Sequence, residues 1–139
     1  MTDFGTISLD GSMATVRFER QYTASVQELW SALTDADQMR RWLGATVSIE
    51  GRVGGAVQLR WDSGDEMRGV ITVFDPGRVL EYTWCEQALG VDSVVRFELR
   101  AEPPGTVLVL DHTQVPADQR TRLLETHQLP AKHAAVFTG

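Results

Sequence analysis

A chain of 139 residues with 42% hydrophobic and 23% charged residues has the size and composition of one globular domain, which we expect to span residues 1–139. Its net charge of −6, without a basic cluster, argues against binding to nucleic acid or to an anionic membrane surface. The single cysteine, Cys85, excludes an intrachain disulfide, and the first residues carry no leader pattern. We therefore expect a cytoplasmic protein without a membrane span.

Two short helices are predicted directly after a first strand. Ser25 and Glu28 have the spacing of a capping box, in which each side chain bonds the backbone N–H of the other residue. The second helix has Thr34 or Asp35 as its cap and Gly44 as its stop. The apolar positions are Val26, Leu29, Trp30 and Leu33 in the first helix, and Met39, Trp42 and Leu43 in the second.

Strands are predicted at 14–22 and again after the Gly54-Gly55 pair, where apolar residues begin to alternate with polar ones. The sequence at 62–65 is typical of a hairpin turn. One register keeps the apolar residues of both strands on the same face. It pairs Trp61 with Met67, Leu59 with Gly69 and Val57 with Ile71.

The meander continues after a turn at 75–78, with turn residues again at 103–105 between strands at 91–100 and 107–113. Counting outward from the second turn places Arg96 opposite Asp111, which predicts a cross-strand ion pair on a solvated face. The apolar residues then share the other face: Leu80, Tyr82 and Trp84 in one strand, and the pairs Phe97–Leu110, Leu99–Leu108 and Val95–His112 in the next two.

This order of elements resembles the family named after the activator of heat-shock-protein-90 ATPase homologue, within the START-like helix-grip (SRPBCC) superfamily. The resemblance covers roughly residues 14–115. The residues that carry it are Val26-x-x-Leu29-Trp30-x-Ala32-Leu33-Thr34-Asp35, Trp42, Gly54-Gly55, Gly69 before Asp75-Pro76, Leu80-x-Tyr82-x-Trp84, and Leu108-x-Leu110-x-His112.

The resemblance implies an α+β helix-grip fold: a curved antiparallel sheet of about six or seven strands, two short helices after the first strand, and a C-terminal helix that closes an apolar cavity. Pro116 suits the first turn of that last helix, but Pro130 interrupts it and the tail at 131–139 lacks an amphipathic stripe. The C-terminal helix is therefore expected to be shortened. Because an uncovered apolar sheet favours association, we also expect a homodimer.

His112 is the candidate for chemistry, since the register turns it inward beside Val95 and near Trp84. An inward imidazole could orient a polar ligand group or act as a general base. The alternative is a buried neutral histidine bonded within the core, and Asp111 points to the opposite face. No metal-ligand spacing, cofactor motif or established catalytic motif is present.

An aromatic and aliphatic wall could bind a small apolar ligand, although plain core packing explains each of its residues equally well. We expect a binding domain for a small hydrophobic or amphipathic molecule rather than an enzyme. Two alternatives stay open: a polyketide cyclase or hydratase that uses His112, and an interaction module that acts on a chaperone ATPase. The predicted ligand-binding residues are Trp42, Leu59, Trp61, Met67, Ile71, Trp84, Phe97, Leu110 and His112.

Overall fold

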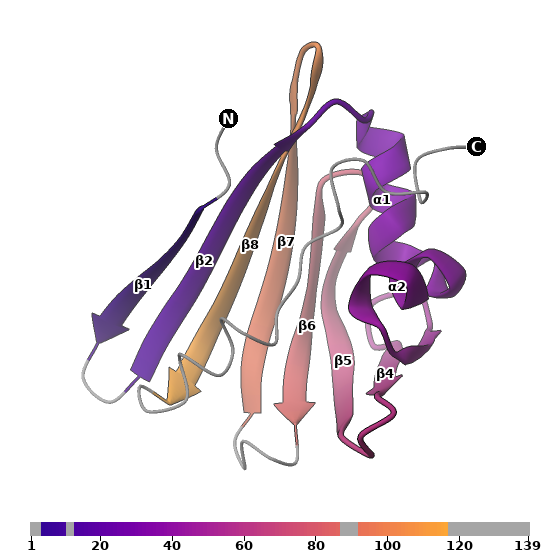
Figure 1. Cartoon of the computed structure of the whole chain (residues 1–139), viewed down its shortest axis with the longest axis vertical. Coiled ribbons are helices and arrows are strands. Elements are labelled where there is room, and N and C mark those ends of the chain that lie inside the picture. The colour runs from indigo at the N-terminus through magenta and orange to yellow at the C-terminus, as the bar shows by residue number, and fades with distance from the viewer. Residues whose placement is uncertain (1–3, 11–12, 87–91, 117–139) are drawn as a thin grey trace.

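The computed structural model describes residues 4–10, 13–86 and 92–116. Their strands form one antiparallel sheet of eight strands in the order β1-β2-β8-β7-β6-β5-β4-β3. Figure 1 shows the two helices packed across the end of the sheet that contains β4 and β5. The bounds are β1 Phe4–Asp10, β2 Met13–Tyr22, α1 Val26–Thr34, α2 Ala36–Leu43, β3 Thr46–Ile49, β4 Ala56–Arg60, β5 Glu66–Asp75, β6 Val79–Glu86, β7 Asp92–Glu102 and β8 Gly105–Pro116.

The predicted α+β helix-grip class is confirmed, with eight strands in place of six or seven. The two additional strands are the edges of the sheet: β1 precedes the first predicted strand, and β3 lies between α2 and the Gly54-Gly55 pair. The predicted C-terminal helix after Pro116 falls outside the described residues. Among the described helices, none is long and apolar enough to cross a membrane.

Both helices begin and end where local chemistry predicts. The Oγ atom of Ser25 accepts the Glu28 N–H at 3.1 Å, and Glu28 Oε1 accepts the Ser25 N–H at 3.2 Å, so the capping box is complete. Asp35, rather than Thr34, caps α2 by accepting the Asp37 N–H at 2.8 Å. Gly44 ends α2 at φ 66°, a conformation that glycine adopts without steric cost.

The predicted register of the β4–β5 hairpin is wrong by two residues. Leu59 lies opposite Met67, and Val57 lies opposite Gly69. The loop occupies residues 62–64, one residue earlier than the predicted register requires, and it is closed by a 2.9 Å hydrogen bond from the Trp61 N–H to the carbonyl of Asp65. Because a shift of two residues preserves the alternation, the apolar side chains remain on the predicted face.

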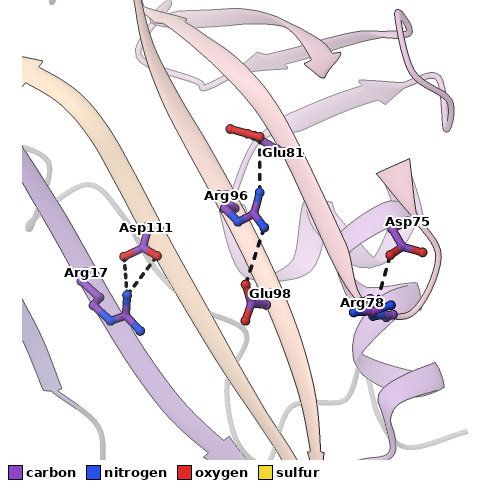
Figure 2. A network of polar contacts seen from close by, with 7 residues as sticks. All are labelled: Arg17, Asp75, Arg78, Glu81, Arg96, Glu98 and Asp111. Atoms are coloured by element: carbon purple, nitrogen blue, oxygen red, sulfur yellow. Dashed lines mark hydrogen bonds and ion pairs between the residues drawn. The ribbon is translucent and has the colours of Figure 1, made fainter. Parts of the chain in front are cut away.

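The predicted β7–β8 register is confirmed, but the ion pair expected from it does not form. Asp111 accepts from Arg17 of β2 at 3.1 and 3.2 Å, while Arg96 lies 3.5 Å from Glu81 and 3.7 Å from Glu98. Figure 2 shows both arrangements. Asp111 has β2 on its other side, and the β2–β8 register places Arg17 directly opposite it. The turn sequence of a hairpin predicts only the pairing of its own two strands and not a contact between strands so far apart in sequence.

The sheet therefore has two chemically different faces. The apolar face is defined here by the buried sheet residues that share one core cluster with residues of α1 and α2; it contains Tyr22, Val57, Leu59, Met67, Ile71, Leu80, Tyr82, Trp84, Val95, Phe97, Leu99, Leu108 and Leu110. The opposite, charged face contains Arg17, Arg68, Glu81, Arg96, Glu98, Arg100 and Asp111.

Candidate functional site

A buried polar pair lies within the apolar face. Ser93 on β7 and His112 on β8 are both 0% exposed, and 2.6 Å separates Ser93 Oγ from His112 Nε2. Ser93 Oγ also lies 3.1 Å from the carbonyl oxygen of Trp84, to which it donates. A hydroxyl has one proton, so the arrangement that satisfies both contacts has His112 Nε2–H donating to Ser93. In that tautomer Nε2 is a donor and does not act as a base toward the serine.

Strand register explains how this pair comes together. His112 is paired with Val95 of β7 on one side and with Val16 of β2 on the other, so its strand neighbours are apolar. Ser93 lies opposite Trp84 in the β6–β7 ladder. The indole of Trp84 meets the imidazole of His112 edge-on at 5.4 Å. The two polar side chains thus share an environment of aromatic and β-branched groups.

Two tryptophans connect the helices to this face through their polar ends. The indole N–H of Trp42, on α2, donates to the carbonyl of Ala32 at 2.8 Å, and its ring meets Phe97 edge-on at 6.3 Å. The indole N–H of Trp61, just beyond β4, donates to the carbonyl of Leu43 at 3.1 Å. Both indoles satisfy their N–H donors while their rings pack against the core, buried for Trp42 and half-buried for Trp61.

The nine predicted ligand-binding residues come from five strands, one helix and one loop, and the structure brings them to one region. Leu59, Met67, Ile71, Trp84, Phe97, Leu110 and His112 are all buried on the apolar face, Trp42 is buried on α2, and Trp61 is half-buried. Contact with a ligand stays a prediction for these residues. One pocket in the described part of the chain includes Leu59 and Met67 in its lining, and another includes none of the nine residues, so the expected cavity between sheet and helices also stays a prediction.

Sequence reasoning missed Ser93, although the confirmed register contained the signal. Residues 93, 95, 97 and 99 share one face of β7, so Ser93 had to point toward the same side as His112. The phenol of Tyr82, another buried group nearby, has its pKa raised above its ordinary value of 10.0 by burial. Within the described residues, no cluster of three or more histidine, cysteine, aspartate or glutamate side chains is placed to hold a metal ion.

An eight-stranded antiparallel sheet with two short helices against its apolar face defines a START-like domain of the helix-grip class. Residues 23–129 match the family model described as Activator of Hsp90 ATPase homolog 1-like protein. The chain belongs to this family, which confirms the predicted resemblance. No match was found among curated proteins.

Solved structures with the same fold come from several organisms. CalU16 from Micromonospora echinospora is 26% identical at a TM-score of 0.71, covering 87% of this chain and 74% of its own. Protein MLL2253 from Mesorhizobium loti is 30% identical at a TM-score of 0.71, and the match covers 78% of this chain and 82% of that protein's chain. PFC0360w, an HSP90 activator from Plasmodium falciparum, is 21% identical at a TM-score of 0.69, and the match covers 83% of this chain and 89% of that protein's chain. At this identity the match shows similarity of fold alone.

Proposed function

We propose that this protein binds a small hydrophobic or amphipathic molecule against the apolar face of its sheet, with Ser93 and His112 orienting the polar part of that molecule. The observation that carries the proposal is the 2.6 Å contact between these two buried side chains beside Trp84. Ligand sites commonly combine apolar and aromatic walls with a few placed polar groups. That combination is present here.

Binding requires side chains to move, because the residues of this region are packed together. Met67 is fully buried in the same core cluster as the aromatic wall. Methionine side chains repack more readily than branched ones because they are unbranched and have three rotatable bonds. We therefore expect the side chain of Met67 to move when a ligand enters.

Two other readings have narrower support. A chaperone-directed interaction rests on the description of the family and not on a particular contact among the described residues. A cyclase or hydratase needs His112 as an acid or base, whereas the hydrogen bonds of Ser93 favour His112 as a fixed donor. Homodimerisation through an incompletely covered sheet is part of the proposal, and it rests on the interruption at Pro130.

The proposal is tested by fluorescence titration with N-phenyl-1-naphthylamine, an uncharged apolar probe, followed by displacement with 1-decanol. We expect saturable probe binding with energy transfer from tryptophan, and displacement by the alcohol. Ser93→Ala and His112→Gln should weaken displacement by about fivefold, the value of one hydrogen bond, while leaving probe binding nearly unchanged. Trp84→Leu should weaken both the binding of the probe and its displacement by 1-decanol.

Arg60→Gln is the matched control, because Arg60 lies on the exposed side of β4 and pairs with Glu66 at 3.0 Å. Its binding of both molecules should equal that of the unaltered protein. Absence of saturable probe binding would contradict the proposed function. If the probe binds saturably and 1-decanol displaces it equally well from Ser93→Ala and from the unaltered protein, the role given to the polar pair is contradicted.

A further inference from the structure

Another pocket lies where the β5–β6 turn, the far half of β7 and the start of α1 meet, and of the apolar face it includes only Leu99. Its volume is about 480 Å³, within the range of small-molecule sites. The lining combines an apolar part with three arginines and a single carboxylate: Val26, Gly77, Arg78, Val79, Arg96, Glu98, Leu99, Arg100 and Ala101. Three of the four charged residues in this lining are arginines, whereas the net charge of the chain is −6.

The backbone holds this pocket in shape. The Arg78 N–H donates to the carbonyl of Asp75 at 2.9 Å, which closes the turn, and the Leu99 N–H donates to the carbonyl of Arg78 at 2.8 Å. Arg78 is therefore anchored beside β7, from which Arg96 and Arg100 project on the charged face. A Cβ atom on Gly77 would come within 3.6 Å of Val26, so the turn also abuts α1.

The three arginines of the pocket differ from others on the sheet in how their charges are paired. Their ion pairs are all long: Arg78 lies 3.8 Å from Asp75, Arg96 lies 3.5 and 3.7 Å from Glu81 and Glu98, and Arg100 lies 3.9 and 3.6 Å from Glu19 and Glu102. By contrast, Arg17 and Arg60 make hydrogen-bonded pairs at 3.0–3.2 Å.

The long pairs leave guanidinium N–H donors available within the pocket. Each guanidinium has five donors in a planar fork, and charge-assisted hydrogen bonds to oxyanions form at about 2.7–2.9 Å. Figure 2 shows Arg96 between Glu81 and Glu98, and Arg78 beside Asp75. Apart from Glu98, these carboxylate partners lie outside the lining of the pocket.

We infer that this pocket binds an organic anion, a carboxylate or phosphate that carries a small apolar group. Arg78, Arg96 and Arg100 would hold the oxyanion, while Val26, Val79 and Leu99 would contact the apolar group. Arg78 and Arg100 are more than half exposed, so the binding should be weak and reduced by salt. This inference is independent of the ligand proposed for the apolar face.

The test is titration of the full, ¹⁵N-labelled chain with benzoate, phenyl phosphate and uncharged benzyl alcohol, followed by the amide resonances of Gly77, Val79 and Ala101. Both anions should shift these resonances saturably, with a dissociation constant of the order of 1 mM, and benzyl alcohol should not. Arg78→Gln and Arg100→Gln should each weaken binding by about fivefold to tenfold. The tighter of the two anions identifies the head group.

Arg17→Gln is the matched control, because it removes one positive charge from the same face outside the pocket. Its affinity for both anions should equal that of the unaltered chain. The inference is overturned if neither anion shifts the three amides at about 20 mM, if benzyl alcohol shifts them equally, or if Arg78→Gln and Arg100→Gln bind as well as Arg17→Gln does.

Discussion

Tyr82 illustrates how burial of one side chain creates a pH dependence for the whole fold. Its phenol is 1% exposed, and desolvation raises its pKa above the ordinary value of 10.0. Above pH 10 the unfolded chain releases this proton, whereas the folded chain retains it. The folded state then binds more protons than the unfolded state, so stability falls as the pH rises.

We therefore expect the free energy of unfolding to decrease by up to about 1.4 kcal/mol per pH unit above pH 10 because of this one group. Tyr82→Phe should flatten the profile in that range, since phenylalanine has no proton to release. Urea unfolding at pH 8, 10 and 11 measures the difference between the two proteins. An identical pH profile for Tyr82→Phe would contradict the assignment.

Gly69 is a position where a single added carbon should be costly. A Cβ atom there would collide with the carbonyl oxygen of Thr83 on β6, which is a backbone atom rather than the end of a flexible side chain. Gly69→Ala should therefore lower the free energy of unfolding by about 2–3 kcal/mol, as overpacking does in other cores. Chemical denaturation monitored by tryptophan fluorescence provides the measurement.

Gly51→Ala is the matched control for Gly69. A Cβ atom on Gly51 would lie 3.5 Å from the ring of Phe74, which is an ordinary contact. Gly51→Ala should change the free energy of unfolding by no more than about 0.5 kcal/mol, as expected for a substitution on the surface. Equal stability of the two variants would show that the sheet relaxes around Gly69.

Helix α1 depends on its first turn, because nine residues are too few to be stable without a cap and a packed face. Ser25→Ala removes the acceptor for the Glu28 N–H and should cost about 1 kcal/mol. Ser25→Asp, which retains an acceptor, should recover most of that loss. Thermal unfolding of both variants tests this, and Ser48→Ala on exposed β3 serves as the control.

The two helices are also positioned by groups outside them. Trp61 donates to Leu43 at the end of α2, and Trp42 of α2 donates to Ala32 of α1. These hydrogen bonds place the helices on the apolar face while the rings pack against Trp84 and Phe97. The aromatic wall thus contributes to the fold as well as to the proposed site.

For the molecule as a whole, the interrupted helical pattern at Pro130 leads to the expectation of a homodimer. Size-exclusion chromatography with light scattering should give a mass of twice 15.4 kDa at micromolar concentrations. Pro130→Ala, which removes the interruption, should shift the mass toward that of the monomer. A monomer for the unaltered protein at all concentrations would contradict the prediction.

Several features followed from the sequence because a few neighbouring residues decide them. The capping box needs Ser25 and Glu28 alone, and the end of α2 needs Gly44. The alternation that buries Leu80, Tyr82 and Trp84 has a fixed period of two, so it identified the apolar face even where the β4–β5 register was wrong by two residues.

Other features depend on which strands become neighbours, and local sequence does not encode this. β2 pairs with β8, although some 90 residues separate the two strands in sequence. Asp111 therefore forms its ion pair with Arg17 rather than with Arg96. The contact between Ser93 and His112 needs the exact stagger of two strands, and the anion pocket needs α1 to abut the β5–β6 turn. Sequence determined which side chains face inward, while tertiary packing decided which of them meet, because long-range contacts depend on the arrangement of the whole sheet.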